Sequence, residues 1–261
     1  MGHPYLDGPH PRAYAHRGWH TGGGLENTMA GFVRAVDEGF SYLELDVHAS
    51  ADGVAVVHHD ATLDRTTDGA GRLALLHSGA LADVRVGGIE PVPLLADVLA
   101  ALPDVRVTIE LKSAGAVDAV LAVLERLDAW HRVCLGAFDE RRLVRARRLG
   151  GARLCTSMGQ ASAIGLRSRA WLDALPAPLS LLPAPPFTGQ LAQLPHRLGP
   201  LTVVDDRLIA AAHAAGREVH VWTVDDPAEM VGLLDAGADG LLTDRPDLLR
   251  EVLRSRGAWA P

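Results

Sequence analysis

Two histidines stand at the ends of short apolar runs, where a titratable side chain usually indicates a site rather than a solvated surface. His16 ends the run RAYAH, and His59 follows the run VAVVH. Because imidazole titrates near neutral pH, a pair of histidines can supply a general acid and a general base. We therefore predict that His16 and His59 are catalytic. His58 points to the opposite side of the same strand from His59 and is the poorer candidate.

Carboxylates gather on one side of two further strand-like runs. In YLELDVH, Glu44 and Asp46 share a face, and in VRVTIELK, Glu110 shares a face with Lys112. Carboxylates held close together repel each other and raise one another's pKa unless a cation lies between them. An all-oxygen ligand set favours Mg²⁺ or Ca²⁺ over Zn²⁺. We predict that Glu44, Asp46 and Glu110 bind one divalent cation; the alternative is simple pairing with Arg and Lys.

Arg17, just after the first strand-like run, and Lys112, two positions after Glu110, are the positive groups that we expect beside these acids in the fold. Their simplest role is charge balance, and their functional role is to hold a phosphate group. A carboxylate-lined pocket repels an anion unless a divalent ion bridges the two. We predict that Arg17 and Lys112 bind an anionic substrate.

Other polar and aromatic residues are expected to line the same region. Trp222, in VHVWTVDD, either fills the interior or forms a wall for a glycerol or alkyl group. Asp244, in LLTDRP, either orients a basic neighbour or caps the last helix. We expect His20, His48 and His220 to line the site without catalysing. Zinc ligation by His58, His59 and Asp60 is disfavoured, since consecutive residues rarely converge on one ion.

Strand-like and helix-like segments alternate along the 261 residues, in about eight units with short turns. This pattern predicts an α/β fold, a (β/α)₈ TIM barrel in a single domain over 1–261. An open doubly wound sheet is the rival, weakened because no G-x-G-x-x-G motif opens the first unit. Residues 61–92 are predicted to form a loop-like excursion, and the proline-rich segment 176–200 is expected to contain the sixth strand. In MAGFVRAVDEGF, residues 29, 32, 33 and 36 are expected to share one helical face.

Composition narrows the class of protein. A net charge of −7 argues against a nucleic-acid binder. The sequence has no run of 18 apolar residues, so no membrane span is predicted. The N-terminal segment lacks the apolar stretch of a signal peptide, and Cys134 and Cys155 are predicted to be buried thiols rather than a disulfide framework. A cytoplasmic protein is therefore expected. No feature indicates an oligomeric interface, with 176–200 as the weak candidate.

An ordered series of short motifs resembles the glycerophosphodiester phosphodiesterase family. The series runs nearly the whole length of the chain: His16-Arg17-Gly18, Glu26-Asn27-Thr28, Glu44-x-Asp46, Asp52-Gly53, His59-Asp60, Leu63, Arg65-Thr66-Thr67, Gly69-x-Gly71, Glu110-Leu111-Lys112, Val221-Trp222-Thr223-Val224, Asp239-Gly240 and Thr243-Asp244. The resemblance implies a barrel enzyme that hydrolyses small-molecule glycerophosphodiesters to sn-glycerol 3-phosphate and an alcohol. It also implies His16 and His59 as the acid/base pair, Glu44, Asp46 and Glu110 as the metal ligands, and Arg17 and Lys112 as phosphate contacts.

The chain departs from the family pattern near its first loop. Leu25 stands where the family usually has Pro, after three glycines at 22–24, so this loop is expected to be more mobile. The family's insertion after the His-Asp strand, which shapes the alcohol pocket, is short here and confined to 61–92. The alternatives are a phospholipase D-like hydrolase of lysophospholipids, disfavoured without an apolar or basic membrane anchor, and a non-catalytic phosphate-binding barrel.

Overall fold

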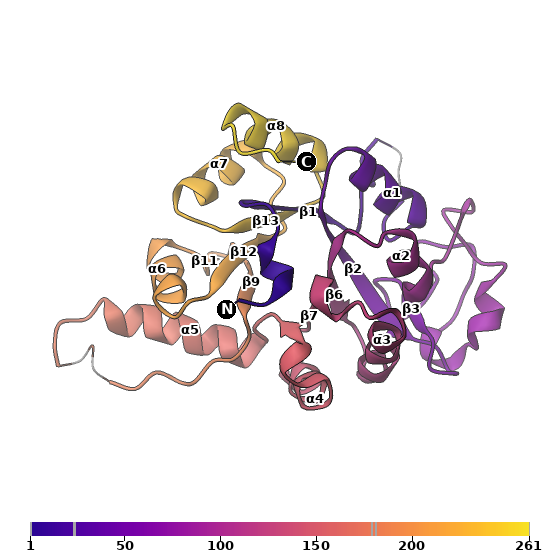
Figure 1. The fold of residues 1–261 in the computed structure, drawn as a ribbon, viewed down its shortest axis with the longest axis horizontal. Helices are drawn as coiled ribbons and strands as arrows, with labels where there is room; N and C mark the ends of the chain where they lie inside the picture. The colour runs from indigo at the N-terminus through magenta and orange to yellow at the C-terminus, as the bar shows by residue number, and fades with distance from the viewer. Residues whose placement is uncertain (1, 23–24, 179, 181, 261) are drawn as a thin grey trace.

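The computed structural model describes residues 2–22, 25–178, 180 and 182–260. Eight parallel strands alternate with eight helices around a barrel (Figure 1). The strands are β1 (Arg12–His16), β2 (Tyr42–Ala49), β6 (Arg106–Leu111), β7 (Val133–Gly136), β8 (Cys155–Thr156), β9 (Leu191–Pro195), β12 (Glu218–Trp222) and β13 (Gly240–Thr243). The helices are α1 (Met29–Asp37), α2 (Leu95–Ala101), α3 (Ala114–Leu127), α4 (Glu140–Gly150), α5 (Gln160–Asp173), α6 (Asp206–Ala214), α7 (Pro227–Asp235) and α8 (Pro246–Ser255).

The sheet closes on itself. The strand order is β8-β7-β6-β2-β1-β13-β12-β9, so the first and last barrel strands in the sequence lie side by side. Its two ends are joined by a parallel bridge between Ser157 and Leu191 and by the backbone bond from Gln190 N to Thr156 O, 2.8 Å. The predicted (β/α)₈ barrel is therefore confirmed, and the open doubly wound sheet is excluded.

Alternation along the strands determines what faces the helices and what faces the interior. Leu43, Leu45 and Val47 of β2 belong to the main apolar core between barrel and helices, as predicted. The side chain of Thr108 of β6 points inward, where Tyr5 contacts it. On α1 the buried face differs from the expected one, because Val33 is 38 % exposed. A 100° step per residue carries this position past the edge of the apolar stripe.

The N-terminal segment seals the end of the barrel that lies opposite the carboxyl ends of the strands. A short 3-10 helix, η1 (Pro4–Asp7), brings Tyr5 into the interior. Its hydroxyl lies 2.7 Å from Thr108 Oγ1 and 3.0 Å from the hydroxyl of Tyr14. Cys134 and Cys155 are buried free thiols beside this cluster, as predicted.

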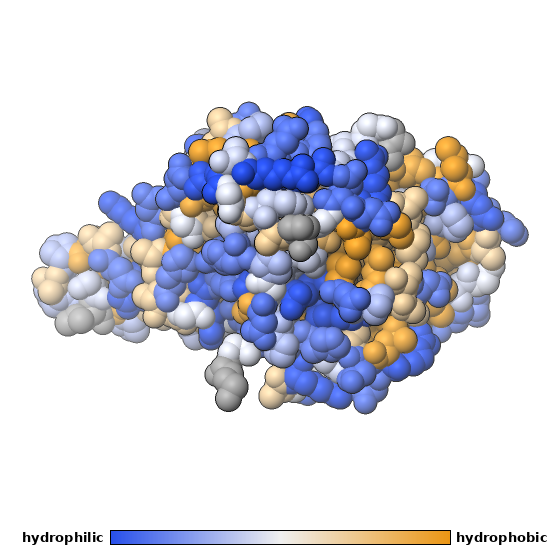
Figure 2. Space-filling model, turned by 45° about the horizontal axis from the view of Figure 1, so that its top comes forward, coloured by the Kyte–Doolittle hydropathy of each residue, from blue (hydrophilic) through white to orange (hydrophobic). Residues whose placement is uncertain are grey.

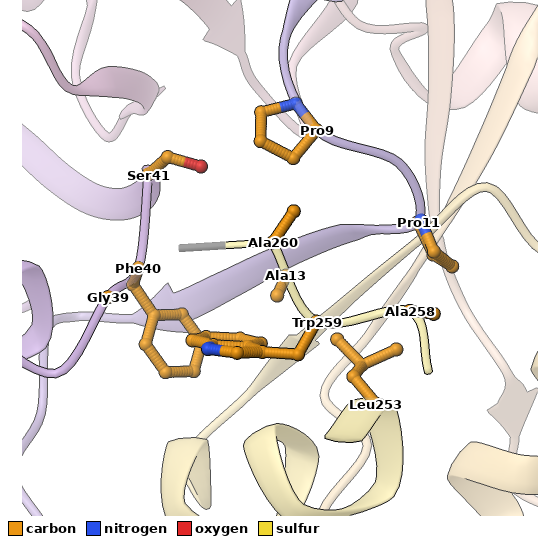
Figure 3. Close-up of a pocket in the computed structure, with 10 residues that line it drawn as sticks. All are labelled: Pro9, Pro11, Ala13, Gly39, Phe40, Ser41, Leu253, Ala258, Trp259 and Ala260. Carbon is orange, nitrogen blue, oxygen red and sulfur yellow. The ribbon is translucent and has the colours of Figure 1, made fainter. Parts of the chain in front are cut away.

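A hollow at the same closed end is covered by the C-terminal segment. Figure 3 shows the ring of Trp259 against that of Phe40, near Ala13 and Leu253. The two rings are 5.0 Å apart in an edge-to-face arrangement. The hollow is lined mainly by apolar and backbone groups, so we assign it a packing role.

The excursion over residues 61–92 is more structured than the loop expected from the sequence. It follows β3 (Ala55–Val57), which pairs antiparallel with β2 and stands outside the barrel path. It contains two 3-10 helices, η2 (Leu73–Leu75) and η3 (Ser78–Leu81), and a hairpin of β4 (Arg85–Val86) and β5 (Glu90–Pro91). Five of its buried residues form an apolar cluster together with Val56 of β3: Leu63, Leu73, Leu81, Val86 and Val92.

The proline-rich segment does contain the sixth barrel strand, β9. The apolar run LTVVD after it is not a barrel strand, since only Leu201–Thr202 (β11) pairs, in a hairpin with Arg197–Leu198 (β10). Within the proline-rich segment, Leu179 and Leu181 lie outside the described residues, as do Gly23 and Gly24 of the first loop. α5 and the segment after it extend from one side of the molecule (Figures 1 and 2).

The surface shown in Figure 2 is mostly polar, with smaller apolar areas between the polar side chains. Among the described residues, none of the helices has the length and apolar character that a membrane crossing requires.

Candidate active site

The predicted functional side chains come together at the carboxyl ends of neighbouring strands. In the β1–β2 register His16 pairs with Glu44, and in the β2–β6 register Asp46 pairs with Glu110. Side chains at paired positions of adjacent parallel strands point to the same side of the sheet. The barrel rim thus brings an imidazole and three carboxylates together from three different strands.

The three acids meet the geometric requirement for a metal site. Glu44, Asp46 and Glu110 each place one carboxylate oxygen within 4.8 Å of the others. Glu44 and Asp46 are buried, and Glu110 is half-buried. Among the described residues, His58, His59 and Asp60 do not form such a group.

Two cations balance part of this negative charge. Lys112 Nζ lies 3.0 Å from Asp46 Oδ1 and 2.9 Å from Glu110 Oε2, and Arg17 Nε lies 3.2 Å from Asp46 Oδ2. Burial alone would raise the pKa of Asp46, but Lys112 and Arg17 hold it below its ordinary value. The alternative prediction, charge pairing with Arg and Lys, therefore holds for Asp46 and Glu110, but these pairs leave the charge of Glu44 unbalanced.

Burial and the nearby charge of Asp46 raise the pKa of Glu44 to about 8. A carboxyl so destabilised in its charged form is a position where a bound cation would remove a repulsion. Asp46 Oδ1, although near Lys112, is buried without a well-aligned hydrogen bond. The donor set is all oxygen, so the residues present fit a hard divalent cation.

The loop after β1 holds Arg17 in an uncommon backbone conformation. Arg17 and Asn27 both have φ of +55°, in the left-handed region. Their backbones are joined by the bond from Asn27 N to Arg17 O, 2.9 Å. Gly18 is required here, because a Cβ on it would lie 2.9 Å from the backbone of Gly31.

In the sequence, only the family motif Glu26-Asn27-Thr28 indicated Asn27 as a site residue. Its side-chain amide donates to Asp46 Oδ2 at 2.8 Å and so fixes that carboxylate. Leu25, which stands where the family usually has Pro, packs against the apolar cluster of the excursion. It lies so close to Gly87 that a Cβ there would clash with it. It therefore ties the first loop to residues 61–92.

His16 is held by a carboxylate from the last barrel strand. Its Nδ1 donates to Asp244 Oδ1 at 2.6 Å, and its Nε2 lies 3.6 Å from Glu44 Oε2. Burial lowers the pKa of His16, but Glu44 and Asp244 outweigh it and raise the pKa above its ordinary value. His20 Nε2 also donates to Asp244 Oδ1, at 3.1 Å. Asp244 thus orients basic neighbours, as one of the two expectations had it, while α8 begins after Arg245.

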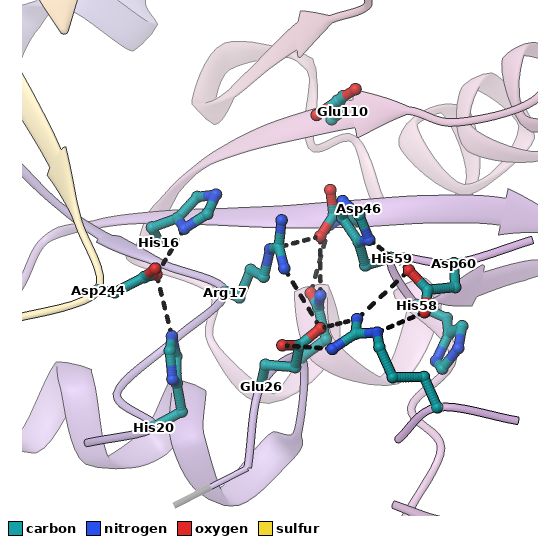
Figure 4. Close-up of polar contacts among 12 residues, drawn as sticks. His16, Arg17, His20, Glu26, Asp46, His58, His59, Asp60, Glu110 and Asp244 are labelled. Atoms are coloured by element: carbon teal, nitrogen blue, oxygen red, sulfur yellow. Dashed lines mark hydrogen bonds and ion pairs between the residues drawn. The ribbon is translucent and has the colours of Figure 1, made fainter. Parts of the chain in front are cut away.

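His59 is held in the same way from the other side. Its Nδ1 donates to Asp60 Oδ1 at 2.6 Å, and Asp60 is also bonded by Arg65. Hydrogen bonding from Arg65 lowers the pKa of Asp60 well below its ordinary value. In Figure 4, Arg17 lies between His16 on one side and Asp46 and His59 on the other.

The remaining histidines have supporting positions. His48 Nε2 donates to the backbone oxygen of His59 at 3.1 Å, and His58 Nε2 donates to that of Thr62 at 3.0 Å. His220 lies fully buried between Tyr14 and Glu218 in the interior of the barrel. It therefore fills the core instead of lining the site.

Trp222 lies at the carboxyl end of β12, half-buried against the interior cluster. Its ring meets that of Phe138 edge to face, with centroids 5.6 Å apart. Phe138 comes from the loop after β7 and is 58 % exposed. The aromatic pair spans the mouth above β8 and β9, because these strands separate β7 from β12 in the barrel.

Nearly the whole length of the barrel also matches a known protein family. The model of the glycerophosphoryl diester phosphodiesterase family matches residues 15–248. The chain belongs to this family. The predicted enzyme class, a phosphoric diester hydrolase, is thereby confirmed.

Individual relatives agree with the family assignment. A probable glycerophosphodiester phosphodiesterase 2 from Mycobacterium tuberculosis is 40 % identical over 95 % of this chain and 92 % of its own length. A putative glycerophosphoryl diester phosphodiesterase from Silicibacter pomeroyi has a TM-score of 0.79 at 26 % identity, covering 99 % of this chain and 100 % of its own. A phosphodiesterase from Oleispira antarctica, solved with the product sn-glycerol-3-phosphate, shares the fold with a TM-score of 0.75 at 23 % identity, covering 94 % of this chain and 97 % of its own.

Proposed function

We propose that this family member hydrolyses glycerophosphodiesters to sn-glycerol 3-phosphate and an alcohol, with a divalent cation and two histidines. The observation that carries the proposal is the acidic triad flanked by two imidazoles, each anchored to a carboxylate through Nδ1. The probable glycerophosphodiester phosphodiesterase at 40 % identity supports the substrate class. The relative solved with sn-glycerol-3-phosphate supports the product.

Glu44, Asp46 and Glu110 would hold Mg²⁺ or Ca²⁺. When bound, the ion neutralises charge on the phosphodiester and stabilises the charge that builds up on its oxygens. Arg17 and Lys112 lie beside these acids and supply further positive charge to a phosphate group.

His16 and His59 are the proton-transfer groups of the proposal. Because Nδ1 of each ring donates to a carboxylate, Nε2 of each is left to face the reacting groups. One ring removes the proton from the nucleophile and the other donates a proton to the leaving alkoxide. The nucleophile is either water or the glycerol hydroxyl next to the ester; transient cyclic phosphate in the product mixture distinguishes the second route.

Trp222 and Phe138 are proposed to contact the carbon atoms of the substrate at the opposite side of the mouth. The exposed Phe138 and the half-buried Trp222 offer apolar surface, whereas the metal side of the mouth is charged. The substrate would thus lie with its phosphate on the β1–β6 side and its apolar part against β12.

The experiment is a direct assay of glycerophosphocholine beside lysophosphatidylcholine, with release of glycerol 3-phosphate and choline measured separately. The proposal predicts glycerol 3-phosphate from glycerophosphocholine. Activity confined to lysophosphatidylcholine would instead favour the lysophospholipase D-like alternative. His16→Ala and His59→Ala are each expected to lower kcat at least about 100-fold. Retention of most activity in either variant would contradict the acid/base assignment.

A further inference from the structure

Arg65 extends from the excursion into the mouth of the barrel and contacts two carboxylates at once. Its Nε donates to Asp60 Oδ2 at 2.5 Å, and its Nη2 donates to Glu26 Oε1 at 2.7 Å. Longer bonds of 3.3 Å reinforce both pairs, from Nη2 to Asp60 Oδ1 and from Nη1 to Glu26 Oε2. Figure 4 labels the two acids, Glu26 and Asp60.

Each of these carboxylates holds a different proposed functional group. Asp60 accepts the Nδ1 proton of His59 at 2.6 Å. Glu26 lies 3.3 Å from Nη1 of Arg17, whose Nε contacts Asp46. One side chain therefore connects a proposed acid/base group to a proposed phosphate-binding group, although the two come from different loops.

We propose that Arg65 is a positioning residue, which fixes the Asp60–His59 pair and the Glu26–Arg17 pair in one relative arrangement. The inference rests on the proposed function and deepens it, since Arg65 acts on His59 and Arg17 and does not itself touch the reacting atoms. A planar fork is needed to bond two carboxylates in this way, and a lysine ammonium offers only a point charge.

The exposure of Arg65 argues against a purely structural role for this residue. The side chain of Arg65 is 48 % exposed, and ion pairs at such positions contribute little to folding. The excursion has its own buried apolar cluster, which holds its shape without Arg65. Removing the guanidinium should therefore leave the fold intact and change the geometry of the site.

The first test compares Arg65→Ala and Arg65→Lys with Arg72→Ala, an exposed control in the same segment. Wild-type hydrolysis of glycerophosphocholine is measured first, and its absence would overturn the proposed function independently of Arg65. We expect Arg65→Ala to lower kcat/KM about 10- to 100-fold, as loss of a group that orients functional residues does elsewhere. Arg65→Lys should stay at least about fivefold below the wild type because it lacks the fork. Arg72→Ala should match the wild type.

The second test observes His59 without using activity. Nitrogen-15 NMR of the histidine rings reports which ring nitrogen carries the proton. We expect the wild type and Arg72→Ala to show the Nδ1-protonated form of His59, and Arg65→Ala to lose that preference. The proposal is overturned if Arg65→Ala keeps the wild-type tautomer and a kcat/KM within about twofold of the wild type.

A double-mutant comparison isolates the path through Asp60. If Arg65 acts on His59 through this carboxylate, adding Arg65→Ala to Asp60→Ala should cost much less than Arg65→Ala costs alone. Full additivity of the two losses would contradict the path.

Discussion

His16 Nδ1 and Asp244 Oδ1 lie 2.6 Å apart, although 228 positions separate the two residues in the sequence. The contact exists because β1 and β13 are adjacent in the closed barrel, with Ala15 opposite Thr243 in the register. Asp244 thus performs for His16 the orienting role that Asp60, next in the sequence, performs for His59. The pairing of β1 with β13 therefore positions His16, one of the two proposed acid/base residues.

Replacing Asp244 by Asn should lower kcat about 10- to 100-fold, because a neutral amide neither favours the Nδ1-protonated tautomer nor stabilises an imidazolium as well. KM should change little, since Asp244 contacts His16 and His20 rather than the acidic triad. Steady-state kinetics on glycerophosphocholine measure both constants. Asp247→Asn, at the rim beside Arg245, is the matched control and should be near wild type. A wild-type kcat in Asp244→Asn would rule out the orienting role.

Glu218 at the closed end of the barrel should contribute pH-dependent stability. Burial works against its charge, but hydrogen bonds from Arg12 and His220 outweigh burial and lower the pKa of Glu218 to about 2. Because the folded pKa lies below the ordinary value, this stabilisation is complete above about pH 4.5 and disappears as the pH falls towards 2. We expect Glu218→Gln to lower the free energy of unfolding by about 2 to 3 kcal/mol at pH 7.

The check for Glu218 is urea unfolding of both proteins at pH 7 and at pH 3. The difference in free energy of unfolding between wild type and Glu218→Gln should shrink at the lower pH. An equal difference at both values would show that the charge of Glu218 is not the cause.

Arg132 should stabilise the end of α2 by satisfying backbone oxygens. Its buried guanidinium donates to the backbone oxygens of Leu99 (2.6 Å), Leu102 (2.9 Å) and Val105 (3.1 Å). Arg132→Met keeps the apolar bulk but leaves these acceptors unpaired, at a cost of about 2 to 4 kcal/mol. Thermal and urea unfolding measure the loss. Arg126→Met, on the exposed face of α3, should differ from the wild type by less than about 0.5 kcal/mol, and an equal effect of the two changes would contradict this role.

The fold was predictable where apolar residues repeat with the period of a strand or a helix. Alternation in YLELDVH separates Leu43 and Leu45, which face the helices, from Glu44 and Asp46, which face the interior. β9 was harder to find, because Pro195 ends it and Gln193 faces inward, where its amide donates to Thr108 Oγ1 at 3.0 Å. A short strand with an inward amide lacks the apolar pattern by which strands are recognised.

The candidate site was predictable in its separate parts but not in its connections. The acids Glu44, Asp46 and Glu110 were predictable as neighbours because strand periodicity places them on one face. The bridge from Asp60 through Arg65 to Glu26 joins two loops, and its geometry depends on the path of the excursion. No local sequence period specifies such a contact, and only the family motifs indicated that these residues matter.

The most direct test of the central claim, a divalent cation held by Glu44, Asp46 and Glu110, is the rate of glycerol 3-phosphate release from glycerophosphocholine before and after chelation. The account predicts that EDTA abolishes release, that Mg²⁺ or Ca²⁺ restores it, and that Glu110→Gln needs a higher ion concentration for the same rate. Full activity of the wild type after complete removal of divalent ions would contradict it.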